Sequence, residues 1–279
     1  MGYLKSIIVI PSAYLKPDKL GFLSHLLTKE EISLTISDSS SIFQAPASSG
    51  ALFLTDSAEA CQQLLGAGQA VLIFLHPENS SESFSSAKYA CENLTDLTPD
   101  YLERVYRRYR GIPWDILTTP RLLLRETTVE DVDSFLSIYS DPEITRYTEA
   151  LYPREEEIAY TRDYIRNMYE FYGFGIWTVI ERSTGVIIGR AGLTMREGYE
   201  DPELGYVIGT PWQNLGYATE ALRAILTYAK EELGLDTLRA LVKPDNKKSR
   251  HLLEKLGFSE SLWNDSQNQE YIHYCRRNL

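Results

Sequence analysis

The sequence predicts two successive α/β domains, and three observations lead to this prediction. The chain has 279 residues, of which 43% are hydrophobic, enough for the cores of two domains of ordinary size. Apolar runs typical of strands alternate with stretches of helical spacing. Two prolines and a glycine interrupt this periodicity in "GIPWDILTTP", residues 111–120. We therefore expect one domain in residues 1–115 and a second in residues 116–279.

The first domain is predicted to be a small, Rossmann-like α/β unit. Residues 4–10 form the apolar run of a buried strand, and residues 19–31 have helical spacing. After a Ser-rich loop, the strand-like run "ALFLT" precedes a helix at residues 57–65 and a second run, "AVLIFL". This order predicts parallel strands with a right-handed crossover. "LTPDYLERVYRRY", with Pro99 in its first turn, predicts a final helix.

The second domain is predicted to contain a sheet that starts antiparallel. "RLLLRETT" is strand-like, and the segments "VEDVDSFLSIYSD" and "REEEIAYTRDYIRNMYEFY" predict two helices. Three strand-like runs follow, "FGIWTVIE", "VIIGRAGLTM" and "ELGYVIG", and "RSTG" between the first two predicts a hairpin turn. A helix that ends at Gly234, the strand "LDTLRALVK" and a short helix that ends at Gly257 complete the order.

The charge and the cysteines limit the classes of partner and compartment. The net charge of −11 argues against nucleic acid as the partner, because duplex binding relies on Lys and Arg, and it favours cationic substrates. Cys61, Cys91 and Cys275 are far apart and lack C-x-x-C spacing, which predicts reduced thiols and no metal site. No apolar run approaches the length of a membrane span, and "SIIVI" is too short for a signal peptide. We expect a cytoplasmic protein without membrane association.

A turn of small residues separates an apolar run from a helix in "PWQNLGYATEAL", residues 211–222. The N–H groups in the first turn of a helix have no partner inside the helix and point along its axis, so such a turn can hold an anion. Gly216 and Ala218 leave room for a phosphate, and the Thr219 hydroxyl adds a donor. The alternative is a tight strand-to-helix connection without a ligand.

The segments "TPRLLLRE", "LGYVIGTPWQNLGYATEAL" and "NKKSRHLLEKLGF" occur in this order within residues 119–279. Together they resemble the GNAT acetyltransferase superfamily, and within it the ribosomal-protein N-terminal acetyltransferases. The family's cofactor motif is Gln or Arg, two residues, Gly, any residue, then Gly or Ala, which matches Gln213 to Ala218. The resemblance implies a GNAT-like mixed, mainly antiparallel sheet with flanking helices. It also implies acetyl-coenzyme A as co-substrate, without a metal.

The resemblance also implies which residues contact the coenzyme. In the family the pantetheine arm pairs with the backbone of a splayed central strand, where one N–H polarises the thioester carbonyl. The matching strand here is "ELGYVIG". Leu215 stands where many relatives carry a basic residue. The expected coenzyme contacts are Tyr206, Val207, Ile208, Gln213, Asn214, Leu215, Gly216, Tyr217, Ala218, Thr219 and Asn246.

Acyl transfer to an amine also needs a base and a proton donor for the leaving thiolate. Glu203 is the expected base, directly or through water, or alternatively a solvated acidic residue. Many relatives carry a donor tyrosine seven positions after the asparagine that Asn246 matches, but that position holds Leu253. Ser249 matches the serine of the N-terminal acetyltransferase subgroup and is the expected donor, or alternatively a helix-capping residue. The other donor candidates are Tyr271 and Tyr274.

Two functions remain open at this point. The first is an N-acetyltransferase in which a primary amine, on a protein N-terminus or a small molecule, attacks the thioester directly in a ternary complex. The second, favoured by Leu253, is a non-catalytic acyl-coenzyme A-binding protein with a regulatory or interaction role. Residues 1–115 lie outside the resemblance and could restrict acceptor access, bind a partner or form a homodimer. Within them, Thr55, Asp56 and Ser57 are expected to cap the following helix.

Overall fold

The structure is a computed structural model that describes residues 2–38, 50–261 and 270–279. The chain divides into two compact units, Met1–Trp114 and Asp115–Leu279, each described here by itself. Most of the expected Ser-rich loop, residues 39–49, lies outside the described residues. Within the described part of the chain, no helix combines the length and the apolar character needed to cross a membrane.

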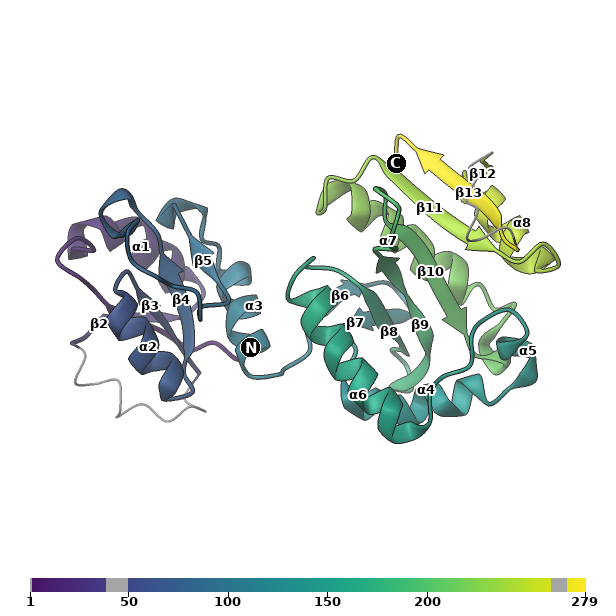
Figure 1. Ribbon diagram of the computed structural model, residues 1–279, viewed down its shortest axis with the longest axis horizontal. Helices are drawn as coiled ribbons and strands as arrows, with labels where there is room; N and C mark the ends of the chain where they lie inside the picture. Colours follow the sequence, from purple (N-terminus) through teal and green to yellow (C-terminus); the bar gives the residue numbers. More distant parts are fainter. Residues whose placement is uncertain (1, 39–49, 262–269) are drawn as a thin grey trace. The chain divides into compact units, whose positions relative to one another are not determined.

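The described part of the first unit forms a parallel sheet with flanking helices (Figure 1). The strand order is β2-β1-β3-β4-β5, and β3 and β4 are buried along their whole length, as their apolar runs predict. The Rossmann-like prediction is confirmed, although it lacked the mostly exposed β2 and the short β5. The elements are β1 (Ser6–Ile10), α1 (Gly21–Lys29), β2 (Ser33–Ile36), β3 (Ala51–Thr55), α2 (Ala58–Gly66), β4 (Ala70–Phe74), β5 (Ala90–Cys91) and α3 (Pro99–Tyr109).

A buried carboxylate joins three strands of this unit at their carboxyl ends. Asp56, 1% exposed, follows β3 and accepts hydrogen bonds from Ser12 N at 2.7 Å and Ser12 Oγ at 2.6 Å, after β1. His76 Nε2, after β4, lies 3.2 Å from the same carboxylate. Ser57 caps α2 as expected, because its Oγ accepts from Ala60 N. The expectation that Asp56 also caps this helix is wrong, since its carboxylate binds residues of the neighbouring strands instead.

Replacing Asp56 with alanine is expected to lower the free energy of opening of the first unit by about 3 kcal/mol. The change leaves the backbone N–H of Ser12 without an acceptor and His76 Nε2 without its partner, and each buried unpaired group costs about 1–3 kcal/mol. Hydrogen–deuterium exchange at β3 and β4 measures the effect. The matched control is Asp18→Ala, at an exposed carboxylate of the same unit. Equal exchange in both variants would contradict the structural role of Asp56.

The described part of the second unit forms a larger, mainly antiparallel sheet with the order β12-β13-β11-β10-β9-β8-β7-β6. Strands β10 and β11 are its single parallel pair among the described residues. Figure 1 shows α4 and α6 in front of this sheet and α7 behind it. The elements are β6 (Asp115–Thr118), β7 (Leu122–Arg125), α4 (Val132–Tyr139), α5 (Pro142–Thr145), α6 (Arg154–Tyr164), β8 (Ile176–Glu181), β9 (Val186–Thr194), β10 (Glu203–Ile208), α7 (Tyr217–Glu231), β11 (Thr237–Val242), α8 (Lys247–Lys255), β12 (Ser259–Glu260) and β13 (Ile272–Arg277).

The mixed, mainly antiparallel sheet and the β8–β9 hairpin confirm the sequence prediction, but two segments differ from it. The helix expected to run unbroken through "IRNMYEFY" changes to a π-helix at Ile165–Tyr169. Tyr169 is 1% exposed there, and its hydroxyl accepts from Thr127 N at 3.1 Å, so tertiary packing outweighs the helical pattern. The stretch expected to be linker contains β6, which pairs with β7 at the sheet edge.

Candidate functional site

The two central strands of the larger sheet part from each other. Strand β10 pairs with β11 only at Glu203, opposite Arg239, whereas it stays paired with β9 from Glu203 to Ile208. Residues 204–208 therefore have one backbone edge that faces away from β9 and is not bonded to β11. An unpaired strand edge offers N–H and C=O groups in the spacing that an extended ligand can use.

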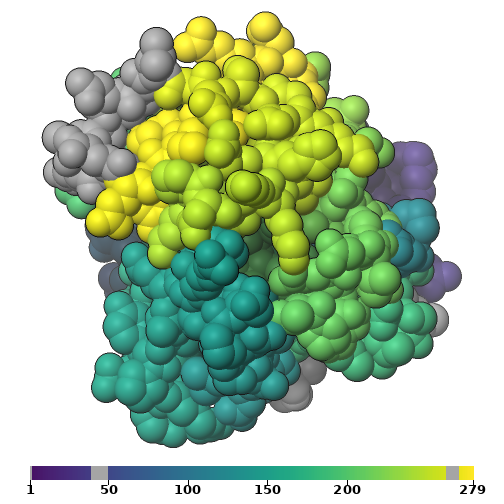
Figure 2. Space-filling view, turned by 90° about the vertical axis from the view of Figure 1, so that its right-hand side faces the viewer, coloured from purple at the N-terminus to yellow at the C-terminus, as the bar shows by residue number. Residues whose placement is uncertain are grey.

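A pocket of about 410 Å³ lies where these strands part. Figure 2 shows the surface hollowed between the teal, green and yellow-green segments, which carry α5, the start of α7 and the start of α8. Of the predicted coenzyme contacts, all except Leu215 line it, and Ser249 lines it too. The lining residues are Glu143, Ile144, Tyr147, Thr148, Tyr206, Val207, Ile208, Trp212, Gln213, Asn214, Gly216, Tyr217, Ala218, Thr219, Asp245, Asn246, Lys247, Lys248, Ser249 and Leu252.

The turn before α7 contains two residues with positive φ. Asn214 and Gly216 adopt left-handed conformations, with φ of +61° and +83°. At Gly216 this conformation is strained for any residue with a Cβ. Helix α7 begins directly after it at Tyr217, so the N–H groups of the first helical turn lie at the pocket wall. Gln213 holds the turn to the end of β10, because its Nε2 donates to Ile208 O at 3.0 Å.

Residues far away in sequence hold this turn in place. Arg121 Nη1 donates to Leu215 O at 2.9 Å, and Arg121 Nε lies 2.6 Å from Glu220 Oε2 on α7. Thr119 Oγ1 donates to the other oxygen of Glu220 at 2.6 Å. Burial opposes ionisation of Glu220, but the bonds from Thr119 and Arg121 outweigh it and lower its pKa. The segment "TPRLLLRE" therefore supports the turn, a role that its sequence did not predict.

Two lysines at the start of α8 line the pocket. Leu215 is 55% exposed and does not line the pocket, whereas Lys247 and Lys248 do. Lys248 Nζ lies 3.4 Å from Gln213 Oε1 across the pocket mouth. The sequence prediction missed these two lysines, although their position directly after Asn246 was a usable signal. They can supply the positive charge that Leu215 does not.

Two hydroxyl groups meet inside the pocket. The Tyr206 hydroxyl on β10 donates to Ser249 Oγ on α8 at 3.0 Å. Asn246 positions Ser249, because its Oδ1 accepts from Ser249 N at 3.1 Å and so caps the helix. Burial raises the pKa of Tyr206 and outweighs the hydrogen bond to Ser249, so the phenol keeps its proton at neutral pH. The sequence predicted only a backbone role for Tyr206.

The other catalytic candidates lie outside this pocket lining. Glu203 Oε2 lies 2.6 Å from Arg196 Nε. Because side chains alternate along a strand, Glu203 is on the opposite sheet face from Tyr206. Leu253 is buried in the core at 1% exposure. The Tyr274 hydroxyl contacts Arg250 Nε at 3.2 Å instead of the pocket. Neither Tyr271 nor Tyr274 is among the lining residues.

Comparisons with known proteins agree on one class, the acetyltransferases. The profile of the family described as "Acetyltransferase (GNAT) domain" matches residues 121–259. The uncharacterized N-acetyltransferase YoaA of Bacillus subtilis (strain 168) is 32% identical over 149 residues, which cover 52% of this chain and 83% of the relative. The [Ribosomal protein uS5]-alanine N-acetyltransferase of Escherichia coli (strain K12) is 29% identical, with 54% and 82% covered. The chain belongs to the GNAT acetyltransferase family.

Solved structures agree with this fold. The acetyltransferase from Agrobacterium tumefaciens str. C58 superposes with a TM-score of 0.52 at 26% identity, over 58% of this chain and 93% of that one. A ribosomal L7/L12 alpha-N-protein acetyltransferase superposes with a TM-score of 0.50 at 12% identity, over 60% and 95%, which supports the fold alone. Among the described residues, no cluster of His, Cys, Asp and Glu side chains is placed to hold a metal ion.

Proposed function

We propose that this chain transfers the acetyl group of acetyl-coenzyme A to a primary amine. The observation that supports it is the pocket where β10 and β11 part, in front of the first turn of α7. The unpaired strand edge suits an extended pantetheine arm, and the free N–H groups of the helix suit a pyrophosphate. Membership of the GNAT family supports the same co-substrate.

The residues of the pocket fit the groups of the coenzyme. Gly216 and Ala218 leave the N–H groups of the turn accessible to phosphate oxygens, and the hydroxyl of Thr219 adds a donor. Lys247 and Lys248 balance the phosphate charge. The remaining proposed contacts, from the β10 edge, the turn and the α8 cap, are Tyr206, Val207, Ile208, Gln213, Asn214, Tyr217 and Asn246. Leu215 contributes only its backbone, whose carbonyl already binds Arg121.

In the proposed reaction the amine attacks the thioester carbonyl directly in a ternary complex. The C–N bond forms, the C–S bond breaks, the amine loses one proton and the thiolate gains one. Ser249 donates its proton to the sulfur and takes one from Tyr206, 3.0 Å away, and Tyr206 is then reprotonated by water in the pocket. We assign the role of the base to Glu203. Since its carboxylate lies outside the pocket lining, the amine proton reaches it through water. None of the cysteines lines the pocket, which supports direct attack without an acyl-enzyme.

We propose the α-amine of a protein as the acceptor, with a small-molecule amine as the alternative. The E. coli relative carries in its name the alanine of ribosomal protein uS5 as its acceptor, which supports a protein N-terminus here. The net charge of −11 favours the approach of cationic segments.

Saturating acetyl-coenzyme A is expected to raise the melting temperature of the full chain. A ligand at about 100 times its Kd adds about 2.7 kcal/mol of stability. Turnover is then followed with N-terminal peptides and with small amines, by release of free thiol. Stabilisation together with turnover supports the acetyltransferase. Stabilisation without turnover on any amine would favour the non-catalytic coenzyme-binding protein, and no stabilisation would contradict both.

A further inference from the structure

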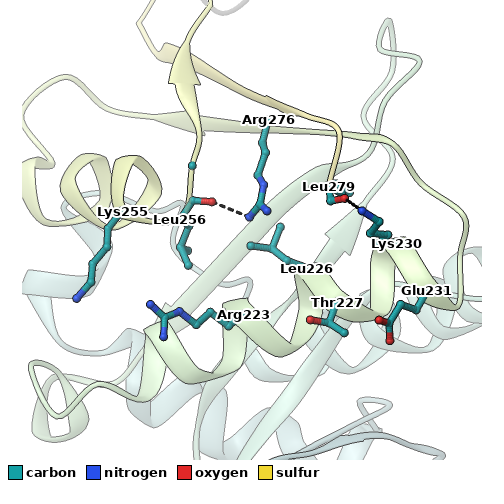
Figure 3. A pocket seen from close by; sticks show the side chains of 10 residues that line it. Arg223, Leu226, Thr227, Lys230, Glu231, Lys255, Leu256, Arg276 and Leu279 are labelled. Atoms are coloured by element: carbon teal, nitrogen blue, oxygen red, sulfur yellow. Dashed lines mark hydrogen bonds between the residues drawn. The ribbon is translucent and has the colours of Figure 1, made fainter.

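A second hollow of the acetyltransferase unit lies away from the proposed coenzyme site. It has a volume of about 540 Å³ and lies between the C-terminal half of α7, the end of α8 and β13 (Figure 3). It shares no lining residue with the pocket where β10 and β11 part. We call it the α7–β13 groove. Its lining residues are Arg223, Leu226, Thr227, Lys230, Glu231, Lys255, Leu256, Gly257, Arg276 and Leu279.

The groove concentrates positive charge in an acidic protein. Four of its side chains are cationic and Glu231 alone is acidic, although the whole chain has a net charge of −11. Arg223, Thr227 and Lys230 are spaced four and three residues apart, so they form one stripe along α7. Lys255 and Arg276 come from α8 and β13. Figure 3 shows Leu226 and Leu256 between these cations.

Among the described residues, no Asp or Glu side chain pairs with these cations. Arg276 Nη1 donates to the backbone carbonyl of Leu256 at 2.6 Å, and Lys230 Nζ donates to the backbone carbonyl of Leu279. The Leu256 acceptor is an uncharged peptide carbonyl. Within the described parts of the chain, no Asp or Glu carboxylate lies within 4.0 Å of the charged nitrogens of the four cations. The cations therefore repel one another, and a bound anion would relieve this repulsion.

Helix dipoles explain only part of this arrangement. Lys230 and Lys255 lie in the last turns of α7 and α8, where a cation is stabilised by the free carbonyl groups. Arg223 lies in the middle of α7, where the dipole gives no such benefit, and Arg276 lies on a strand. Both guanidinium groups nevertheless line the same groove as the lysines.

We propose that the α7–β13 groove binds a small organic diphosphate, such as a nucleoside diphosphate. Guanidinium groups bind phosphate oxygens in pairs, lysines add point charges, and Thr227 adds a hydroxyl donor. The volume lies in the range of small-molecule sites. The buried Leu226 and Leu256 offer an apolar floor for the uncharged part of the ligand. A nucleic-acid polymer fits less well, because the acidic remainder of the chain repels an extended polyanion.

Calorimetric titration of the full chain with ADP and with inorganic pyrophosphate tests this proposal. The wild type is expected to bind both, and the double variant Arg223→Ala/Lys255→Ala to lose at least tenfold in affinity. The matched control, Arg162→Ala/Arg166→Ala, removes two exposed cations of the same unit outside the groove and is expected to bind ADP like the wild type. Equal losses in both double variants, or no binding by the wild type, would overturn the proposal.

A further variant separates this site from the coenzyme pocket. Because the coenzyme pocket is itself proposed to hold a pyrophosphate, Ala218→Glu, which places a carboxylate at the turn before α7, is expected to lose ADP bound at that turn and to keep the ADP bound at the groove with wild-type affinity. Loss of ADP binding in this variant, with retention in Arg223→Ala/Lys255→Ala, would assign ADP to the coenzyme pocket and refute the groove. Binding of a single-stranded RNA oligonucleotide through the groove cations, without ADP binding, would also refute it. Failure of acetyl-coenzyme A to bind would leave the ADP result unaffected.

Discussion

Replacing Ala218 with glutamate is expected to weaken acetyl-coenzyme A binding about 1,000-fold and to abolish turnover at ordinary coenzyme concentrations. Ala218 lies in the first turn of α7 and lines the pocket beside Gly216. A carboxylate there faces the position proposed for the pyrophosphate. Like charges about 4 Å apart near a protein surface cost about 4 kcal/mol, which is about 1,000-fold in affinity. Titration calorimetry with acetyl-coenzyme A measures the change.

The matched control for this variant is Ala224→Glu, which adds the same side chain to the same helix. Ala224 lies within α7 but outside the pocket lining. We expect its affinity for acetyl-coenzyme A to stay within about twofold of the wild type, because Ala224 is half-buried like Ala218 but lies further along the helix, where salt screens its charge from the phosphates. If Ala218→Glu kept wild-type affinity while folded, the turn from Gln213 to Ala218 would not be the phosphate site.

The variants Tyr206→Phe and Ser249→Ala are each expected to lower kcat about 100-fold. Positioned proton transfer contributes about 10²–10⁴-fold to rates, and the two hydroxyl groups form one chain at 3.0 Å. Since neither variant alters the turn before α7, KM for acetyl-coenzyme A is expected to change by less than about threefold. The double variant is expected to be no slower than the slower single variant, because groups that act in series are not additive. Steady-state kinetics measures all three.

The controls for these variants are Tyr172→Phe and Ser259→Ala, which remove the same hydroxyl groups at exposed positions of the same unit. Both are expected to keep wild-type kcat.

A further variant, Glu203→Gln, is expected to slow acetyl transfer because it removes the proposed base. If Tyr206→Phe and Ser249→Ala both kept wild-type kcat, another group would protonate the thiolate. An additive double variant would mean that the hydroxyl groups act separately.

Local patterns predicted most of the fold. The apolar runs of β3 and β4, the Pro99 start of α3 and the "RSTG" hairpin are each encoded within a few neighbouring residues. The missed elements depend on partners elsewhere in the chain. The strand β6 is defined by pairing with β7, and the π-helix by the packing of Tyr169 against Thr127. The predicted elements therefore carry a local signal of their own, whereas β6 and the π-helix are defined by the contacts that they make with another segment.

In the candidate site too, local motifs could be predicted from the sequence, whereas contacts between separate segments could not. The motif from Gln213 to Ala218 and the cap at Asn246 are short, so they could be predicted from the sequence. The hydrogen bond between Tyr206 and Ser249 joins residues 43 positions apart, and the bonds from Arg121 to the α7 turn span more than 90. The ion pair of Glu203 with Arg196, by contrast, spans only seven positions and joins the start of β10 to the loop after β9.

The sequence by itself determined the two α/β units, the family and the turn before α7 that we propose as the phosphate site, because these depend on residue order and local backbone geometry. Only the tertiary structure decided which side chains meet. It brought Lys248 and the Tyr206–Ser249 pair into the pocket, and it turned the Glu203 carboxylate toward Arg196. It also gathered the cations of α7, α8 and β13 around one groove. These contacts depend on the pairing and parting of strands, which no single segment of the chain encodes.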